Sequence, residues 1–191
     1  TYNADKTAGL LADFQSGLVW SKDRISTHVL ENEVNFESDY IITGYTRRRE
    51  WTERTYYFVI EFDKPIVSKE LLEQRDPREK APRYILNVDL GNDSVLNTKV
   101  AMSTTGIEGA KSNHAAEGKE RSFDDVYKDA KKEWNRYLSK VSIEGTDEDK
   151  TNFYTALYHL YIQPNNIADV DGKYVGLNGK ISQSPSGKFY S

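Results

Sequence analysis

The sequence has no cysteine, and this absence removes several kinds of site at once. Disulfides, thiolate zinc sites and cysteine nucleophiles are all excluded. The compartment is not decided by this absence, because exported bacterial proteins can also lack cysteine. The chain also lacks an apolar run of about 20 residues, the length that a helix needs to cross a bilayer. We therefore expect neither a disulfide framework nor a membrane-spanning helix in these residues.

An excess of positive charge is missing as well. The formal net charge is -4 at pH 7, with 26 Lys and Arg against 30 Asp and Glu. Because binding to nucleic acid depends on a concentrated basic surface, this balance gives no reason to propose nucleic acid as a partner. Only 37% of the residues are hydrophobic, but 12% are aromatic, including 13 tyrosines, which argues against disorder. A chain of 191 residues is expected to form one or two domains.

The first part of the chain shows the patterns of β-strands. Short runs there are rich in apolar, aromatic and β-branched residues, which favour a partly buried sheet. These runs are residues 10–12, 17–20, 40–46, 55–62, 84–90 and 97–105. Gly91, Asn92 and Asp93 supply turn chemistry between the last two runs. The last two runs are therefore predicted to pair as a hairpin.

Two stretches between these patterns are predicted to be irregular. Residues 69–82 are dense in charge and contain Pro77 and Pro82, which is typical of a mobile excursion. Residues 106–118 hold three glycines and are interpreted as a loop that leads to the next helix. His114 lies in this stretch with no second histidine or cysteine nearby. We expect His114 to face solvent rather than bind a metal.

Residues 122–140 carry the clearest helix pattern in the chain. Ser122 is a favoured N-cap residue, and Asp124 and Asp125 suit the positive end of the helix dipole. Apolar and aromatic side chains, among them Phe123 and Trp134, recur at helical spacing and form one wide stripe. An aromatic stripe can also be a carbohydrate platform, but this spacing favours core packing. We expect the stripe to be buried, with Trp134 packed against the strands.

A second helix is predicted from residue 147 to about residue 163. Thr146 suits the N-cap, and Asp149 three residues later completes a capping box. Pro164 lacks a backbone N–H, so the helical pattern must stop before it.

Amides, carboxylates and glycines crowd the loop that follows this helix. An EF-hand register that includes Asp169 and Asp171 fails, because Ile167 and Asn178 then occupy positions that need acidic ligands. Asp-Gly and Asn-Gly turns favour a short hairpin around residues 174–175. A loop that faces a sugar or an ion is the alternative, and in it Asn165, Asp169 and Asp171 are the candidate substrate-binding residues.

Four runs of the sequence carry a resemblance to a known family. They are FYTALYHLYIQPNNIADVDGKYVGLNGKI, KVAMSTTGIEGAKSNHAAE, FDDVYKDAKKEWNRYLSKVSIEG and, more loosely, GYTRRREWTERTYYFVIEFDKP. In content and order they resemble an internal segment of glycoside hydrolase family 92, the calcium-dependent, inverting exo-α-mannosidases. The likeness covers essentially the whole chain.

The resemblance implies a mixed β and α fold. Residues 1–121 are expected to form part of an antiparallel β-sandwich of the galactose-mutarotase type, and residues 122–145 a linker helix. Residues 146–191 are expected to begin an (α/α) toroid, the catalytic domain. The resemblance also implies a Glu general acid, a carboxylate general base and calcium ligands that lie beyond Ser191. No catalytic or metal-binding residue is therefore expected within this segment.

Two functional hypotheses from different classes follow. In the first, the parent protein removes terminal α-linked mannose from glycans, with calcium as cofactor and the rest of the same polypeptide as partner of this segment. The family likeness also implies a bacterial protein that is secreted, periplasmic or at the cell surface. In the second, the segment is a non-catalytic carbohydrate-binding or inter-domain β-sandwich module. A Glu acid and an Asp base encoded beyond Ser191 would favour the first hypothesis.

Overall fold

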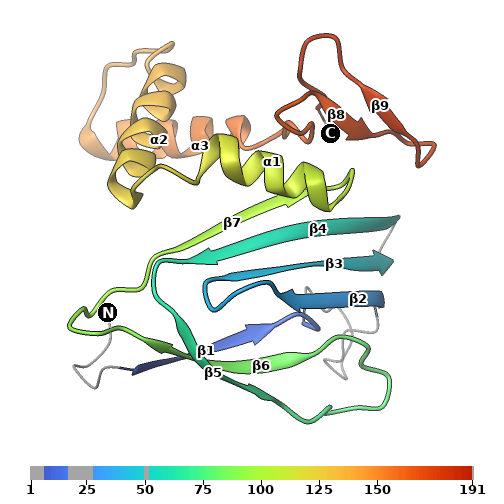
Figure 1. The fold of residues 1–191 in the computed structure, drawn as a ribbon. Coiled ribbons are helices and arrows are strands. Elements are labelled where there is room, and N and C mark those ends of the chain that lie inside the picture. Colours follow the sequence, from blue (N-terminus) through green and yellow to red (C-terminus); the bar gives the residue numbers. More distant parts are fainter. Residues whose placement is uncertain (1–6, 17–27, 50–51, 191) are drawn as a thin grey trace.

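A computed structural model describes residues 7–16, 28–49 and 52–190 of the chain (Figure 1). The first strands are β1 (Thr7–Asp13), β2 (Val29–Phe36), β3 (Ile41–Arg49), β4 (Glu53–Phe62), β5 (Ile66–Leu71), β6 (Arg83–Asp89) and β7 (Thr98–Ser103). The helices α1 (Ile107–Glu117), α2 (Phe123–Leu138) and α3 (Asp147–Tyr161) follow, and then the short strands β8 (Lys173–Val175) and β9 (Ile181–Gln183). The predicted strand at residues 17–20 lies outside the described residues.

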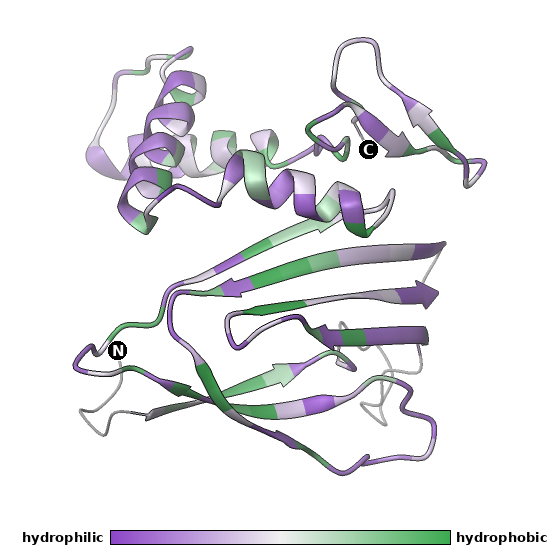
Figure 2. Cartoon of the chain, in the orientation of Figure 1, coloured by the Kyte–Doolittle hydropathy of each residue, from purple (hydrophilic) through white to green (hydrophobic). Residues whose placement is uncertain are grey.

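The long strands form two antiparallel sheets, ordered β1-β6-β5 and β2-β3-β4-β7. Their facing sides share one core, to which the first sheet gives Leu86 and Val88 and the second gives Ile42 and Phe58. Figure 2 shows hydrophobic residues on strands of both sheets, whereas α2 is mostly hydrophilic. The fold is thus mixed β and α with antiparallel sheets, as the sequence predicts. The predicted strands at residues 40–46 and 55–62 are β3 and β4.

The predicted hairpin of residues 84–90 with residues 97–105 is wrong. Both runs are strands, but β6 lies between β1 and β5 in one sheet, whereas β7 pairs with β4 in the other. The segment between them therefore crosses from sheet to sheet. Asn97 fixes its end, because its backbone N–H and its side-chain amide both donate to the Asp63 carboxylate, at 2.9 and 2.7 Å. Turn residues favour a reversal of the chain, but they do not determine the sheet that the next strand joins.

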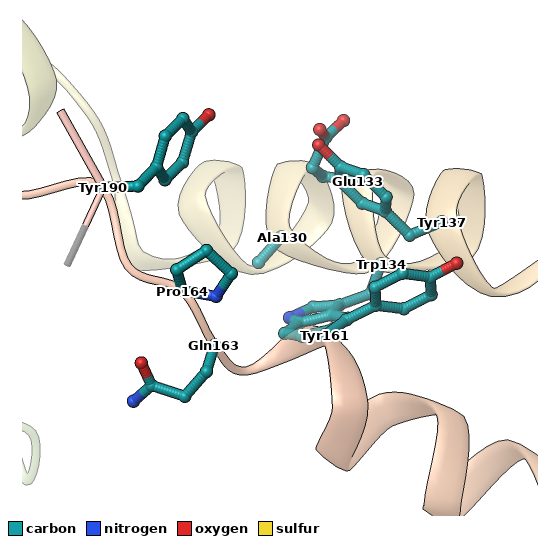
Figure 3. Close-up of a pocket in the computed structure, with 8 residues that line it drawn as sticks. All are labelled: Ala130, Glu133, Trp134, Tyr137, Tyr161, Gln163, Pro164 and Tyr190. Atoms are coloured by element: carbon teal, nitrogen blue, oxygen red, sulfur yellow. The ribbon is translucent and has the colours of Figure 1, made fainter. Parts of the chain in front are cut away.

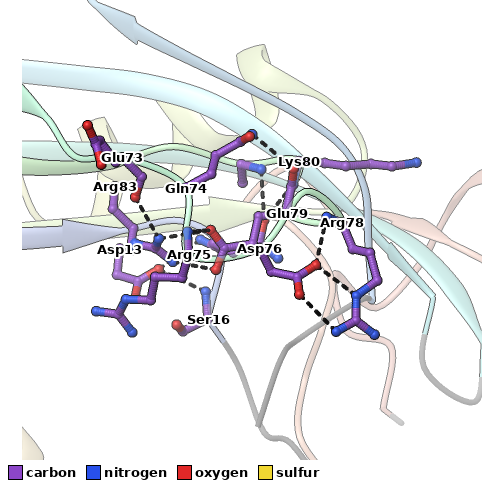
Figure 4. A network of polar contacts seen from close by, with 12 residues as sticks. Asp13, Ser16, Glu73, Gln74, Arg75, Asp76, Arg78, Glu79, Lys80 and Arg83 are labelled. Atoms are coloured by element: carbon purple, nitrogen blue, oxygen red, sulfur yellow. Dashed lines mark hydrogen bonds and ion pairs between the residues drawn. The ribbon is translucent and has the colours of Figure 1, made fainter. Parts of the chain in front are cut away.

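The expectation of a mobile excursion at residues 69–82 is also wrong. Strand β5 runs to Leu71, and the loop beyond it is tied to the sandwich (Figure 4). Glu79 and Arg83 are 7% and 3% exposed, and both guanidinium Nη atoms donate to the carboxylate at 2.8 Å. Gln15, itself buried, accepts hydrogen bonds from the N–H groups of Lys80 and Ala81. Charge density alone does not separate ions that pair inside the protein from ions that face water.

Residues 106–118, interpreted above as a loop, contain helix α1, which lies against β7 and β4. His114 does not face solvent: it is 8% exposed, and its Nε2 lies 2.8 Å from Glu61 Oε2 on β4. Close packing explains why this helix contains a glycine at position 109. A Cβ there would lie 2.5 Å from Ser103 Oγ and 2.6 Å from Asp169 Oδ2. The glycine lets the helix approach the sheet closely.

Helices α2 and α3 begin as predicted, each with a complete capping box. Helix α3 ends at Tyr161, close to the predicted end. The predicted burial of the α2 stripe is wrong, because α2 has no buried residue and Phe123 is 73% exposed. Trp134 packs against α3 rather than the strands, with its ring centroid 4.5 Å from that of Tyr158. No helix in the described part of the chain is both long and apolar enough to span a membrane.

Candidate functional site

The predicted ligand loop folds as a turn followed by a small ribbon. Strands β8 and β9 pair in antiparallel fashion, which confirms the expected short hairpin. Its tip closes through hydrogen bonds from Gly176 N–H to the Lys180 carbonyl and from Gly179 N–H to the Gly176 carbonyl. Gly179 has a φ of 72°, a conformation that glycine adopts without steric cost.

Asp169 is the anchor of this region. It is only 4% exposed, and its carboxylate accepts three hydrogen bonds from distant parts of the chain. Ser103 Oγ donates at 2.8 Å, Thr105 Oγ1 at 2.5 Å and Asn113 Nδ2 at 2.8 Å. These donors come from the end of β7, the turn after it and helix α1. A buried carboxylate needs such partners, because burial without them is costly.

The backbone around Asp169 is held by the same neighbours. Asn113 Oδ1 accepts from the Val170 N–H at 2.8 Å, so this one amide binds both the side chain and the next residue. The N–H of Gly172 donates to the Asp169 carbonyl at 2.8 Å and closes a tight turn. Gly172 has a φ of 82°, and a Cβ there would lie 2.7 Å from Gln183 Nε2. We call Asp169, Ser103, Thr105 and Asn113 the Asp169 anchor.

The other two predicted site residues lie on the surface. Asn165 is exposed, and so is Asp171, whose carboxylate pairs with Lys173 Nζ at 2.7 Å. The hydrogen bond from Lys173 lowers the pKa of Asp171 below its usual range, so the carboxylate is charged at neutral pH. The anchor therefore brings Asp169 inward and leaves Asn165 and Asp171 facing solvent. The role of all three residues in substrate binding stays a prediction.

Ser103, Thr105 and Asn113 were not among the predicted site residues. Each is a common polar residue, and they precede Asp169 by 66, 64 and 56 positions. Nothing in their local sequence signals a shared partner. The one signal in the neighbouring sequence is Gly109, because a glycine inside a helical stretch often marks a place where another chain segment comes close.

The described residues do not fit a calcium ion. No group of three or more His, Asp or Glu side chains in the part of the chain that the structure describes is arranged to hold a metal. Calcium takes about 6–8 oxygen ligands. Both Asp169 oxygens are already occupied by hydroxyl and amide donors, and Asp171 is paired with a lysine. We therefore derive no chemical step through calcium from these residues.

Comparison with known proteins shows what the second part of this chain is similar to. Residues 109–191 match the family model of the glycosyl hydrolase family 92 catalytic domain. The resemblance to family 92 that the sequence motifs indicate is thereby confirmed. No curated protein sequence matches the chain.

Solved structures extend the likeness of fold to the sandwich. The family GH92 α-mannosidase BT3965 from Bacteroides thetaiotaomicron is 22% identical with a TM-score of 0.80, over 97% of this chain and 26% of that one. The GH92 family glycosyl hydrolase ccman5 is 21% identical with a TM-score of 0.81, over 100% and 26% of the two chains. The inverting GH92 mannosidase BT2199 from the same Bacteroides species is 22% identical with a TM-score of 0.69, over 80% and 22%. The chain thus spans about a quarter of the length of these enzymes.

Proposed function

We propose that this chain is part of a glycoside hydrolase that removes terminal α-linked mannose from glycans. The observation that carries the proposal is the match of residues 109–191 to the family 92 catalytic domain. Solved proteins with the same fold add to it, since they are described as α-mannosidases and one was solved in complex with mannoimidazole. We further propose that the reaction inverts the anomeric configuration, as one such mannosidase is described as inverting.

In this proposal the chain positions the site rather than cleaving the bond. An inverting hydrolase needs a general acid and a general base about 6.5–9.5 Å apart, with a water between the base and the sugar. We assign both groups, and the calcium ligands, to the rest of the polypeptide. The Asp169 anchor fixes the ribbon against the sandwich, so Asn165 and Asp171 border the site from a rigid support. We also propose that a bacterial cell exports this protein, because mannose-containing glycans are available outside the cell.

The test compares the full-length protein with the 191-residue chain. Both are incubated with an aryl α-mannoside and with α-mannobiose, with calcium or with a chelator, and aryl glucoside and galactoside serve as substrate controls. We expect turnover of the mannosides by the full-length protein only, loss of activity with chelator, and β-mannose as the first product by NMR. Full-length protein that is inactive on every α-mannoside, or that releases α-mannose first, would contradict the proposal. Turnover by the short chain would show that the catalytic groups lie within it.

A further inference from the structure

The closed end of the β8–β9 ribbon, residues 176–180, holds the single Asn-Gly pair of the sequence, Asn178 and Gly179. Two backbone hydrogen bonds close this tip: Gly179 N–H donates to the Gly176 carbonyl at 2.9 Å, and Gly176 N–H to the Lys180 carbonyl at 3.0 Å. This pattern is typical of a three-residue loop that ends in a left-handed glycine. Leu177, in the middle of the loop, is 98% exposed. The tip is therefore held by backbone geometry and not by packing in a core.

The side chain of Asn178 is turned back onto the backbone of the same loop. Its Oδ1 accepts a hydrogen bond from the Lys180 N–H at 3.0 Å. When a nucleophile adds to Cγ of this amide, negative charge develops on Oδ1, and a backbone N–H that already points at this oxygen stabilises the charge. A nucleophile is adjacent in the chain, because the next backbone nitrogen is that of Gly179. Among the described residues beyond its chain neighbours, no atom lies within 4 Å of the position that a Cβ of Gly179 would take, so no side chain blocks the approach of this nitrogen.

We propose that Asn178 is a site of spontaneous deamidation, a modification that replaces its side-chain amide by a carboxylate. The Gly179 nitrogen forms a bond to Cγ of Asn178 and closes a succinimide ring, the Cγ–Nδ2 bond breaks, and the proton of the attacking nitrogen leaves with Nδ2 as ammonia. Water then opens the ring. Cleavage of the new N–Cγ bond gives aspartate, whereas cleavage of the original peptide bond gives isoaspartate, in which the main chain runs through the side chain. Either product adds a negative charge to a tip whose sequence contains no acidic residue.

One hydrogen bond of the tip opposes this reaction. The attacking nitrogen donates its proton to the Gly176 carbonyl, so this bond must open before the proton can leave. Breaking one hydrogen bond lowers the rate by about fivefold relative to an unfolded peptide of the same sequence. The opening stays local, because the base of the ribbon is held separately by the Asp169 anchor and by Tyr174, whose ring stacks on that of Phe189 with centroids 3.8 Å apart.

The other acid-or-amide and glycine pair of the ribbon, Asp171 and Gly172, lacks these features. Lys173 Nζ lies 2.7 Å from the Asp171 carboxylate, and this hydrogen bond lowers the pKa of the group, so it stays charged and repels an incoming nucleophile. The backbone is fixed as well: the Asp171 carbonyl accepts from Gln183 Nε2 at 2.6 Å, and the Gly172 N–H donates to the Asp169 carbonyl at 2.8 Å. This turn is therefore expected to stay unmodified and serves as an internal control.

The test uses the full-length protein, incubated in mildly alkaline buffer and then digested with trypsin. Cleavage after Lys173 and Lys180 releases the tip as residues 174–180, which mass spectrometry follows beside a synthetic peptide of the same sequence. We expect the mass gain of an amide NH2 exchanged for a hydroxyl, two product peaks in chromatography, and a rate about fivefold below that of the synthetic peptide. The rate should rise with pH, because the attacking nitrogen must lose its proton. Asn178→Gln should show no mass gain, and it leaves the fold intact because Asn178 is exposed.

Two outcomes would overturn the site. A tip peptide that is unchanged when the synthetic peptide has been converted completely would show that the folded tip does not react. A peptide with Asp171 that splits into two peaks as fast as the tip peptide would show that the contacts of the tip do not select Asn178. The result is independent of the proposed function, because it is read from the mass of one peptide and not from the turnover of mannosides.

Discussion

At the scale of single residues, the described part of the protein buries the ion pair of Glu79 with Arg83 and the carboxylate of Asp169. Glu79 and Arg83 form a bidentate pair beneath the loop after β5, and the backbone carbonyl of Glu73 accepts a further bond from Arg83 at 3.1 Å (Figure 4). Burying two charges is costly, and removing one of them leaves the other without compensation. The pair therefore makes the loop sensitive to a single substitution.

We predict that Glu79→Gln lowers the free energy of unfolding by about 3–5 kcal/mol, the usual cost of leaving one partner of a buried ion pair alone. The measurement is urea denaturation of the 191-residue chain. Glu31→Gln is the matched control, because Glu31 pairs with Arg47 at the surface with 54% of its side chain exposed. An exposed pair of this kind contributes about 1 kcal/mol or less. Equal effects of the two substitutions would show that the Glu79 pair is not buried in solution.

A second prediction concerns the Asp169 anchor. Asp169→Ala leaves the Ser103, Thr105 and Asn113 donors without their acceptor, and an unsatisfied buried polar group costs about 1–3 kcal/mol. We expect a matching loss of stability and faster hydrogen exchange of the Val170 amide, which Asn113 otherwise holds. Asp171→Ala, on the surface beside it, should change the stability by no more than about 0.5 kcal/mol. Unaltered exchange at Val170 in Asp169→Ala would exclude an anchoring role.

At the scale of helices and strands, features set by neighbouring residues were predictable and features set by distant ones were not. Both helix starts follow from a cap and a residue three positions later, and both are present as capping boxes. Helix α1 was missed because its stability comes from packing on β7 and β4, which allows a glycine where propensity argues against one. Strand β2 was missed because its sequence, VLENEVNF, places Glu and Asn among its apolar residues, and these two residue types are not typical of strands.

The candidate site divides in the same way. The ribbon and its turns were predictable from Asp-Gly and Asn-Gly. The inward direction of Asp169 was not, because its partners are 56 to 66 positions away. Helical spacing in α2 correctly indicated one aromatic face. The spacing does not determine which element of the fold that face packs against. Trp134 meets α3 and borders a pocket instead of the strands (Figure 3).

The capping box of α3 supplies a prediction at this scale. The Thr146 hydroxyl accepts from the Asp149 N–H at 3.2 Å, and the Asp149 carboxylate accepts from the Thr146 N–H at 3.0 Å. We expect Thr146→Ala to lower the free energy of unfolding by about 1 kcal/mol, and Thr146→Ser to retain most of it because the cap oxygen remains. Thermal unfolding followed by circular dichroism measures both. A Thr146→Ser variant as unstable as Thr146→Ala would argue that the methyl group, rather than the cap, matters.

At the scale of the whole molecule, stability should fall in acid. Hydrogen bonds from Arg83 and Lys111 lower the pKa of Glu79 and of Glu37 from 4.5, the ordinary value that each regains in the unfolded chain. Below that value the unfolded chain binds more protons than the folded one, so the free energy of unfolding decreases as the pH falls. The contribution is complete above the unfolded pKa and is lost as the pH passes through the lower, folded pKa.

We therefore predict a urea midpoint that is constant near neutral pH and drops as the pH falls below about 5, half a unit above the ordinary pKa of these groups. Glu79→Gln removes one of the titrating groups, so its midpoint should depend less steeply on pH. A midpoint that rises on acidification, or a variant with the same slope as the parent chain, would contradict this assignment. High salt should have little effect on the Glu79 contribution, because buried pairs are screened less than exposed ones.

The long separation within the Asp169 anchor also sets the order in which the molecule can be assembled. Ser103 precedes Asp169 by 66 residues, and at about 5–20 residues per second Asp169 is synthesised on the order of 3–13 s after it. A helix or a hairpin forms much faster than that, within about 10 μs. During translation Ser103, Thr105 and Asn113 are therefore made seconds before the carboxylate to which they donate. Closing the anchor exchanges the solvent partners of these three donors for a protein carboxylate, a step that waits until residue 169 has been synthesised.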